Sequence, residues 1–359
     1  MVASFIKKDV DYSTLENRSM EFFRWPNMDS VISGQWFDDF EKYNLDQVAG
    51  RDFLVKANTR LLRTIGKRQM NRVTACDEGA ILMISYDFPA PYKIDPEFTD
   101  SVLLPVSEAA LSYGGQFYYM NLYPRNIYFW DQFPYHRDET VDEYFLSNDE
   151  QMRELSSYAI NTVDTYGITK EHSDEYLFFL SDHHYTFKCA YYAYRTLLDA
   201  INAANPEKAP LEYPMWSDMK IIRPKGNFWG SLVAHLGDVK YNVTDYIEYA
   251  LPDDFPSKYT RLEDGEVSDI PLIRQDDTVE YGWFMNGDYG NTVIKTYRPD
   301  LPSILIIGCS STDAIELMAI YDFNEMHSID PRIFEGDIAQ YVRDAKCDYV
   351  VVQDLFELE

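Results

Sequence analysis

The sequence contains little cysteine, and none of it has the spacing of a metal or redox site. Its four cysteines, Cys76, Cys189, Cys309 and Cys347, are scattered over 359 residues, and no C-x-x-C motif occurs. A disulfide framework needs a denser set of cysteines, and a structural zinc site needs closely spaced ligand pairs. The sequence therefore predicts no disulfide scaffold and gives no indication of a metal or a diffusible cofactor.

Basic residues and long apolar runs are also scarce. Thirty-two Lys and Arg residues stand against 60 Asp and Glu residues, which gives a formal net charge of −28. The electrostatic field of such a negative charge repels phosphate groups, so nucleic acid is not expected as a partner. The longest apolar stretches, at 304–308 and 349–352, are far shorter than the roughly 20 residues needed to cross a bilayer. No membrane-spanning segment is therefore predicted.

Hydrophobic residues make up 46% of the chain, which is enough for a large core. The last sixty residues show how that core is organised. Apolar runs at 303–308, 326–330 and 348–354 alternate with helix-like stretches at 309–321 and 335–345. Strands that alternate with helices of this length predict a parallel sheet covered by helices. The fold class is therefore expected to be α/β, with a parallel central sheet.

The first half of the chain combines helices and short strands. Residues 35–70 place apolar side chains at helical spacing in two helices that are separated near Ala49 and Gly50. Short strands are expected at 80–88 and 116–124, and a helix is expected at 149–165.

Residues 205–300 differ in character from the rest of the chain. Pro, Gly, Asp and Tyr are frequent there and periodic runs are short, which predicts an irregular, loop-rich β insertion. We therefore expect an N-terminal helical extension over residues 1–70 that packs on the core, followed by an α/β domain over residues 71–359.

Ser310 lies at a corner where chemistry is expected. It follows the strand at 303–308 and precedes a helix that begins near Thr312 and Asp313. The unpaired N–H groups and the partial positive charge of a helix N-terminus stabilise an oxyanion, so a serine nucleophile would be well placed there. The alternative is that Ser310 only caps the helix, a role for which serine is preferred. Cys309 is a second possible nucleophile, or simply a small apolar side chain.

Asp182, His183 and His184 form a polar cluster between an expected strand at 176–180 and an expected helix at 186–203. A serine nucleophile needs a base, and that base needs a carboxylate that orients it. Asp182 and His184 can supply both from one short segment at the end of a strand. The alternatives are a metal-binding histidine pair and an ordinary polar loop.

Three segments resemble the DHHW protein family. The string SDHHYTFKCAYYAYRTLLDAI at 181–201 is similar to the family's Asp-His-His-Trp motif and its Ala- and Tyr-rich helix. SILIIGCSSTDAIE at 303–316 resembles the family's strand, Gly-Asp-Ser turn and helix, and FNEMHSIDPRIF at 323–334 resembles its next strand. The N-terminal segments YSTLENR and FEKYNLDQVAGRDFLVK also resemble the beginning of the family's sequences. The resemblance covers most of the chain and is weakest at 205–300.

The resemblance implies an SGNH-hydrolase-like three-layer fold, related to the alginate O-acetylation proteins. It assigns Ser310 as nucleophile, His184 as general base and Asp182 as the carboxylate that orients the base. His183 and Tyr185 would then be neighbours of the site, and Arg332 would match an arginine of the strand that follows the nucleophile.

Two positions depart from the family pattern. Cys309 stands where the family has aspartate, and Tyr185 stands where the name-giving motif has tryptophan. An oxyanion hole would need a donor beyond Ser310, and the turn at 284–291 offers Asn286, Gly287 and Asn291, residues that any tight turn also favours.

These features favour an extracellular serine O-acyltransferase or esterase, most simply an acetyl-transferring one, which acts on a cell-surface or secreted glycan without a cofactor. Aromatic residues around 116–135 and 281–289 suggest a sugar-stacking cleft or, equally, core packing. The alternative is an inactive SGNH-like surface protein that binds glycan or a membrane-bound O-acyltransferase. The first 13 residues lack an export signal, so either the signal is not part of this sequence or the protein is cytoplasmic.

Overall fold

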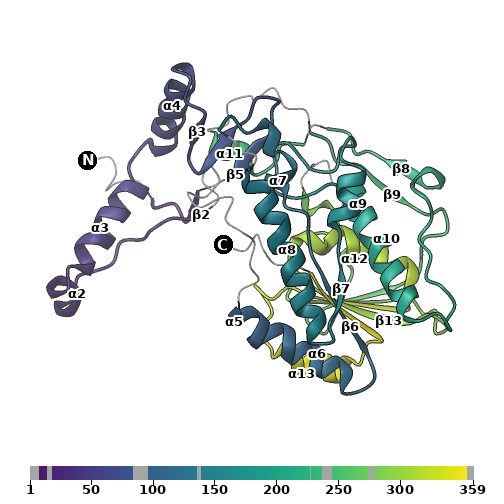
Figure 1. Cartoon of the computed structure of the whole chain (residues 1–359). Coiled ribbons are helices and arrows are strands. Elements are labelled where there is room, and N and C mark those ends of the chain that lie inside the picture. The colour runs from purple at the N-terminus through teal and green to yellow at the C-terminus, as the bar shows by residue number, and fades with distance from the viewer. Residues whose placement is uncertain are drawn as a thin grey trace.

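A computed structural model describes residues 8–13, 18–83, 96–135, 139–226, 228–236, 245–274, 279 and 281–353. Within these residues, a central sheet of eight strands has the order β11-β10-β12-β14-β13-β15-β6-β7 (Figure 1). In that order the strands are β11 Glu266–Ser268, β10 Thr260–Glu263, β12 Asn291–Lys295, β14 Glu325–Ile329, β13 Ser303–Ile307, β15 Tyr349–Gln353, β6 Gln116–Met120 and β7 Asn161–Val163.

The five strands from β14 to β7 are parallel, as the alternation of strands and helices predicts. Ile306 pairs with Ser328 on one side and with Val351 on the other. Of these strands, β14, β13, β15 and β6 are buried along almost their whole length, which is typical of a parallel sheet covered on both faces. β12, β10 and β11 continue the sheet in antiparallel pairing, so three strands from the region at 205–300 extend the central sheet.

Helices cover both faces of the sheet (Figure 1). One face packs against α6 (Leu104–Leu111), α8 (Glu139–Ser157) and α13 (Ile338–Ala345). The other face packs against α10 (Phe187–Ala204) and α12 (Asp313–Asp322). The three-layer α/β architecture expected from the sequence is therefore confirmed.

The remaining elements are short or lie at the N-terminal end. The helices are α2 Met28–Ile32, α3 Gln35–Asp46, α4 Arg51–Thr64, α5 Pro96–Phe98, a π-helix Thr99–Leu103, α7 Arg125–Tyr128, α9 Tyr166–Glu171, α11 Leu232–His235 and the 3₁₀ turns Trp130–Gln132, Trp216–Asp218, Tyr281–Trp283 and Ser310–Thr312. The strands are β1 Tyr12–Ser13, β2 Arg18–Ser19, β3 Gln69–Met70, β4 Val73–Ala75, β5 Ile81–Met83, β8 Lys220–Ile222 and β9 Tyr249–Leu251. In the part of the chain described, no helix combines the length and apolar composition that crossing a membrane requires.

The two helices predicted within 35–70 are confirmed as α3 and α4, separated at Gly50, which adopts a positive φ of 76°. The helix predicted at 149–165 is wrong at both ends. α8 begins at residue 139 and ends at 157, Ala159 then adopts a left-handed φ of 60°, and β7 follows. Residues 84–88 of the strand expected at 80–88 lie outside the described residues. The division of the chain near residue 70 stays a prediction.

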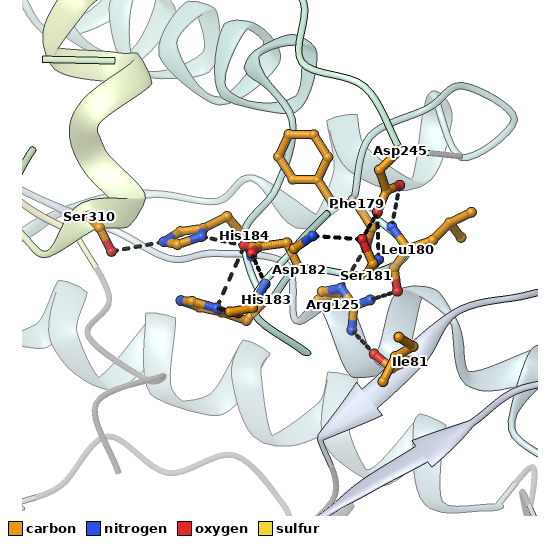
Figure 2. Close-up of polar contacts among 12 residues, drawn as sticks. Ile81, Arg125, Phe179, Leu180, Ser181, Asp182, His183, His184, Asp245 and Ser310 are labelled. Atoms are coloured by element: carbon orange, nitrogen blue, oxygen red, sulfur yellow. Dashed lines mark hydrogen bonds and ion pairs between the residues drawn. The ribbon is translucent and has the colours of Figure 1, made fainter. Parts of the chain in front are cut away.

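The strand predicted at 176–180 does not form. Phe178 makes a single antiparallel bridge with Tyr185, and the segment between them is a loop. Two buried charged side chains replace the missing sheet partners (Figure 2). Arg125 donates to the carbonyls of Ile81 (2.7 Å), Phe179 (2.9 Å) and Leu180 (2.7 Å).

Asp245 holds the same loop from its other side (Figure 2). Its carboxylate accepts hydrogen bonds from the Leu180 N–H at 2.9 Å and the Ser181 N–H at 2.6 Å, and also from the Ser181 hydroxyl. The apolar run at 176–180 predicts a strand, and Leu177, Phe178 and Phe179 are buried. Its backbone, however, is satisfied by side chains rather than by a neighbouring strand.

Replacing Arg125 with Met should destabilise the fold strongly. Three carbonyls would lose their charged donor in a buried place, which costs about 3 kcal/mol or more. Urea unfolding should therefore show a lower midpoint with an unchanged slope. Arg153→Met, at an exposed position on α8, should change the free energy of unfolding by less than about 0.5 kcal/mol. Equal behaviour of the two variants would contradict this role of Arg125.

Two acidic residues are buried in the first turn of α12. Glu316 accepts hydrogen bonds from the hydroxyls of Thr312 and Ser328, and burial raises its pKa to about 7. Asp313 is 4% exposed, one of its carboxyl oxygens has no hydrogen-bond partner, and burial together with the charge of Glu316 raises its pKa well above its ordinary value. Both groups therefore favour the protonated form.

This burial makes the stability pH-dependent. A carboxyl whose folded pKa is raised binds its proton more tightly in the folded state, so the free energy of unfolding falls as pH rises from about 4.5 to about 7. Glu316→Gln keeps both hydrogen-bond acceptor contacts and has no proton to lose. Thermal unfolding should show the variant stabilised at pH 8 by about 1–3 kcal/mol and nearly unchanged at pH 4. The exposed control Glu207→Gln should show no such difference, and a Glu316→Gln variant that is equally destabilised at both pH values would contradict the argument.

Candidate active site

Asp182 and His184 form a local hydrogen-bonded unit in the loop that precedes α10 (Figure 2). One Asp182 carboxylate oxygen lies 2.6 Å from His184 Nδ1 and also accepts the His184 backbone N–H at 3.0 Å. The other oxygen accepts the Ser231 backbone N–H at 2.7 Å. Because the carboxylate accepts at Nδ1, that nitrogen carries the proton and Nε2 presents its lone pair.

Ser310 meets this unit from a segment 126 residues away in sequence. Its Oγ lies 2.8 Å from His184 Nε2, so the three side chains form one row (Figure 2). Ser310 begins the turn between β13 and α12, immediately after Gly308 and Cys309. A Cβ on Gly308 would lie 2.2 Å from a Thr312 methyl carbon, so only glycine allows this sharp corner.

The capping role considered for Ser310 is not observed. The residue at the N-cap of α12 is Thr312, and neither it nor Cys309 at the start of the turn makes a side-chain capping bond. The hydroxyl of Ser310 is directed at His184 instead. Ser310 is partly exposed, whereas Asp182 and His184 are buried. Ser310 is therefore the end of the row that is accessible to solvent.

Tyr281 sets the orientation of the His184 ring. The two rings are stacked with centroids 3.6 Å apart and an interplanar angle of 4°, and Tyr281 is itself buried. His183 contacts the same ring at 3.8 Å, and its Nδ1 lies 3.0 Å from the Ser231 hydroxyl. Rotation of the His184 ring is restricted by these contacts, so its Nε2 stays directed at Ser310.

The charge state of Asp182 suits a residue that orients a histidine. Burial alone would raise the pKa of Asp182, but the charge and hydrogen bond of His184 hold it well below its ordinary value. The N–H of Ser231 acts in the same direction. Asp182 therefore remains ionised at neutral pH and stabilises a protonated His184.

Tyr185 supports the serine rather than the histidine. Its hydroxyl donates to the backbone carbonyl of Ser311 and accepts a hydrogen bond from Gln353 at 3.0 Å. Tyr185 thereby connects the loop of Asp182 and His184 to the turn of Ser310 and to the end of β15.

The turn that was expected to supply oxyanion donors lies against the corner that presents Ser310. Gly287 lines a small cavity together with Gly308, Cys309 and Asp313. Asn286 and Gly287 both adopt positive φ angles, of 63° and 109°, and the carbonyl of Asn286 accepts a hydrogen bond from Tyr289. The turn is therefore tight, and it brings Gly287 to the same cavity as Cys309.

Arg332 and Asn291 hold this turn in place. Arg332 donates to Asp330 at the end of β14 and to Asp288 in the turn, at 2.8 Å for the latter. Asn291 is buried, and its amide donates to the carbonyl of Ser328 and the hydroxyl of Tyr341. Both hydrogen bonds of the Asn291 amide therefore go to groups within the fold, and the amide is not directed at Ser310.

Most aromatic residues that suggested a sugar-stacking cleft are core residues. Those buried from the two stretches are Phe117, Tyr118, Tyr119, Phe129, Trp130, Phe133, Tyr281, Trp283 and Phe284. Of the two alternatives, core packing holds for these side chains, because they belong to the hydrophobic cores on the two faces of the sheet.

One group within the described residues has the geometry of a cation site. Asp182, His183 and His184 can each offer a ligand atom, and these atoms lie within 4.8 Å of one another. However, both Asp182 oxygens and both ring nitrogens of His184 are engaged in the contacts given above. A bound cation would have to displace the hydrogen bonds of the row, so the donor set fits the Asp–His–Ser row better.

Several residues that hold the site were not found from the sequence. These residues come from segments distant in sequence: Tyr281, Ser231, Arg125, Asp245 and Gln353. None of them belongs to a motif with a recognisable spacing, so no local signal could identify them.

No family model matches the sequence, and no curated protein matches it either. Among solved structures, the chain is similar to a DHHW family protein from Eubacterium siraeum DSM 15702, with a TM-score of 0.59 and 18% identity over 79% of this chain and 91% of that chain. It is also similar to PatB1 from Bacillus cereus, with a TM-score of 0.58 and 18% identity over 78% of this chain and 94% of that one. A structure of PatB1 with a sulfonyl adduct is similar to the same degree, with a TM-score of 0.58.

At these identities the likeness concerns the fold. It covers more than three quarters of this chain and about nine tenths of each neighbour. The resemblance read from the motifs around His184 and Ser310 is confirmed at this level. The chain has the SGNH-like α/β fold that it shares with a DHHW family protein and with PatB1.

Proposed function

We propose that this protein is a serine O-acyltransferase or esterase, with Ser310 as nucleophile, His184 as general base and Asp182 as the orienting carboxylate. The observation that carries the proposal is the continuous row from Asp182 through His184 to Ser310, with contacts of 2.6 and 2.8 Å. A nucleophile, a base and a group that orients the base, all within hydrogen-bond reach, constitute the arrangement that acyl transfer through serine requires.

In the first half-reaction, Ser310 Oγ attacks the carbonyl carbon of an acyl donor while His184 Nε2 accepts the hydroxyl proton. The tetrahedral intermediate collapses when the leaving alcohol departs and takes the proton from His184. The product is an ester between the acyl group and Ser310. Asp182, which is ionised, stabilises the imidazolium form of His184 during this step.

In the second half-reaction, the proton of an acceptor hydroxyl passes to His184 Nε2 as the acceptor oxygen attacks the acyl-serine. Collapse of the second intermediate returns the proton to Ser310 Oγ and releases the new ester, or the free acid if the acceptor is water. The same residues therefore serve transfer and hydrolysis, and the acceptor that reaches the site determines which occurs.

The negative charge on the carbonyl oxygen requires N–H donors at the nucleophile corner. Ser310 begins the turn before α12, and Gly287 lines the cavity beside Cys309. We assign the backbone N–H groups of these two residues as the oxyanion donors.

The acyl group, acceptor and location follow from the DHHW resemblance. We propose an acetyl donor, a cell-surface or extracellular polysaccharide as acceptor, and action outside the cytoplasm. A membrane-bound O-acyltransferase is the proposed source of acyl groups. The net charge of −28 suits a neutral or cationic acceptor better than a strongly anionic one.

The alternative function is that of an inactive SGNH-like protein that binds glycan. Its support is Cys309, which replaces the aspartate of the family motif. Asp313 lines the same small cavity as Cys309, so a carboxyl group is nevertheless present at the nucleophile corner. The alternative predicts no turnover and no effect of changes in the row.

The direct test of activity uses 4-nitrophenyl acetate as acyl donor. We expect the wild type to release 4-nitrophenol, and Ser310→Ala and His184→Ala to fall to the uncatalysed rate. Asp182→Asn should retain the fold and lose about 10³–10⁴-fold in kcat, because the histidine tautomer is no longer fixed. Ser217→Ala, in an exposed turn at Trp216–Asp218, should match the wild type.

The controls separate the two possible nucleophiles. Cys309→Ala should keep most of the activity, since the thiol is assigned no chemical step. Loss of activity in Cys309→Ala with retention in Ser310→Ala would reverse the assignment. Identical rates in all variants would favour the inactive, glycan-binding alternative.

Tyr281 provides a separate test of how the base is oriented. Tyr281→Phe keeps the stacked ring and removes a buried hydroxyl that has no hydrogen-bond partner, so kcat should stay near the wild-type value. Tyr281→Leu removes the flat surface under His184 and should lower kcat about 10- to 100-fold, because a displaced base loses its near-attack geometry. Circular dichroism should show both variants folded. Equal kcat values for the two variants would contradict the orienting role.

A further inference from the structure

The N-terminal arm, residues 18–66, stands away from the body of the molecule (Figure 1). Large apolar side chains that are solvent-exposed are concentrated in it. They are Phe22, Trp25, Met28, Val31, Ile32, Phe37, Leu45, Phe53, Leu54, Leu61 and Ile65. Contiguous exposed apolar surface on this scale marks an interaction site.

α4 is the part of the arm with the clearest pattern. Phe53 and Leu61 are eight residues apart, Ile65 follows Leu61 by four at the end of the helix, and the three side chains are 74%, 61% and 71% exposed. The one side chain of α4 that is buried is Thr59, a polar residue. α4 therefore directs its apolar side to solvent, although helices of 14 residues usually owe their stability to a packed apolar side.

The charge of α4 is opposite to that of the rest of the chain. Residues 51–68 contain six basic side chains and one acidic side chain, whereas the chain as a whole has a net charge of −28. Arg60 and Lys67 are exposed beside the apolar stripe. A partner of α4 should therefore combine an apolar surface with negative charge.

Such a surface exists on α8 of the same molecule. α8 contains six acidic residues and one basic residue, the reverse of the 51–68 segment. Beside α8 lies a hollow of about 410 Å³ that is lined by Asp100, Glu150 and Glu154 and by the exposed Pro96 and Tyr158. Within one chain, Figure 1 shows α4 and α8 apart from each other.

We propose that α4 of one chain docks against α8 and the adjacent hollow of a second copy, in a reciprocal twofold dimer. Phe53, Leu61 and Ile65 would bury against Pro96 and Tyr158, and Arg60 would pair with Glu150 or Glu154. A twofold arrangement forms this contact twice, since each chain supplies one basic helix and one acidic hollow. The pairing buries an apolar helix face that otherwise remains in water, and it brings together opposite charges in an otherwise strongly acidic protein.

The test is sedimentation velocity of the full chain over a range of concentrations. The wild type should sediment with twice the mass of one chain. Phe53→Gln combined with Leu61→Gln should shift the protein to monomer, and Val267→Thr, at an exposed apolar position on β11, should leave the dimer intact. All three positions are solvent-exposed, so circular dichroism should show folded chains throughout.

Charge reversal identifies the partner surface. Arg60→Glu and Glu150→Arg should each weaken dimerisation at least about tenfold, since like charges then face each other. An equimolar mixture of the two variants should dimerise again, because the mixed dimer contains one reversed pair and one native pair. Absence of recovery on mixing would exclude this hollow as the partner.

Two further results would overturn the proposal. One is a wild type that is monomeric at every concentration tested. The other is a wild type that co-sediments with phosphatidylcholine–phosphatidylglycerol vesicles through α4, with loss of binding in Phe53→Gln combined with Leu61→Gln and no dimer in solution. That result would assign the same helix face to an anionic lipid surface.

Discussion

The loop from Phe179 to His184 is fixed by buried charges, and the rest of the site depends on it. Asp245 accepts the N–H groups of Leu180 and Ser181, and Arg125 donates to the carbonyls on the other side. A loop in this position would otherwise leave its backbone groups unsatisfied in the core. Because the loop is held in this way, the Asp182 carboxylate accepts a hydrogen bond from His184 Nδ1 and keeps the imidazole ring in one orientation.

The row of Asp182, His184 and Ser310 lies at the edge of the sheet where the parallel strands end. The β13 strand ends at Ile307, and the absence of a Cβ on the following Gly308 permits the sharp turn that presents Ser310. β15 ends at Gln353, which hydrogen-bonds to Tyr185. Parallel strands end at the same edge of a sheet, and ligands of open α/β folds bind outside that edge. Ser310, His184 and the residues that support their loop thus meet at the edge where the parallel strands end.

The parts of the fold that sequence reasoning found are those with a local signal. The strands and helices after residue 303 have clear periodicity, and the serine corner follows from strand, glycine and helix in order. The segment at 176–180 is equally apolar but receives its hydrogen bonds from Arg125 and Asp245, which no local pattern reveals. Tyr281 was missed for the same reason, since stacking on His184 joins residues about a hundred positions apart and leaves no trace in spacing.

The family resemblance supplied what periodicity did not. The resemblance predicts that Asp182, His184 and Ser310 form one site, and the structure places the three side chains in contact. It did not identify the supporting residues, because these follow the particular packing of this chain. Asp313 is one example, as it places a carboxyl group in the cavity beside Cys309, where the family motif has aspartate at the position of Cys309 itself.

The central claim is that Ser310 is activated by His184, and covalent labelling tests it most directly. The protein would be treated with a phenylmethyl sulfonyl fluoride, its intact mass measured, and the labelled peptide sequenced by tandem mass spectrometry. The account predicts one adduct per chain, located on Ser310, with little labelling in His184→Ala and none in Ser310→Ala. An adduct on another residue, or equal labelling of the wild type and His184→Ala, would contradict it.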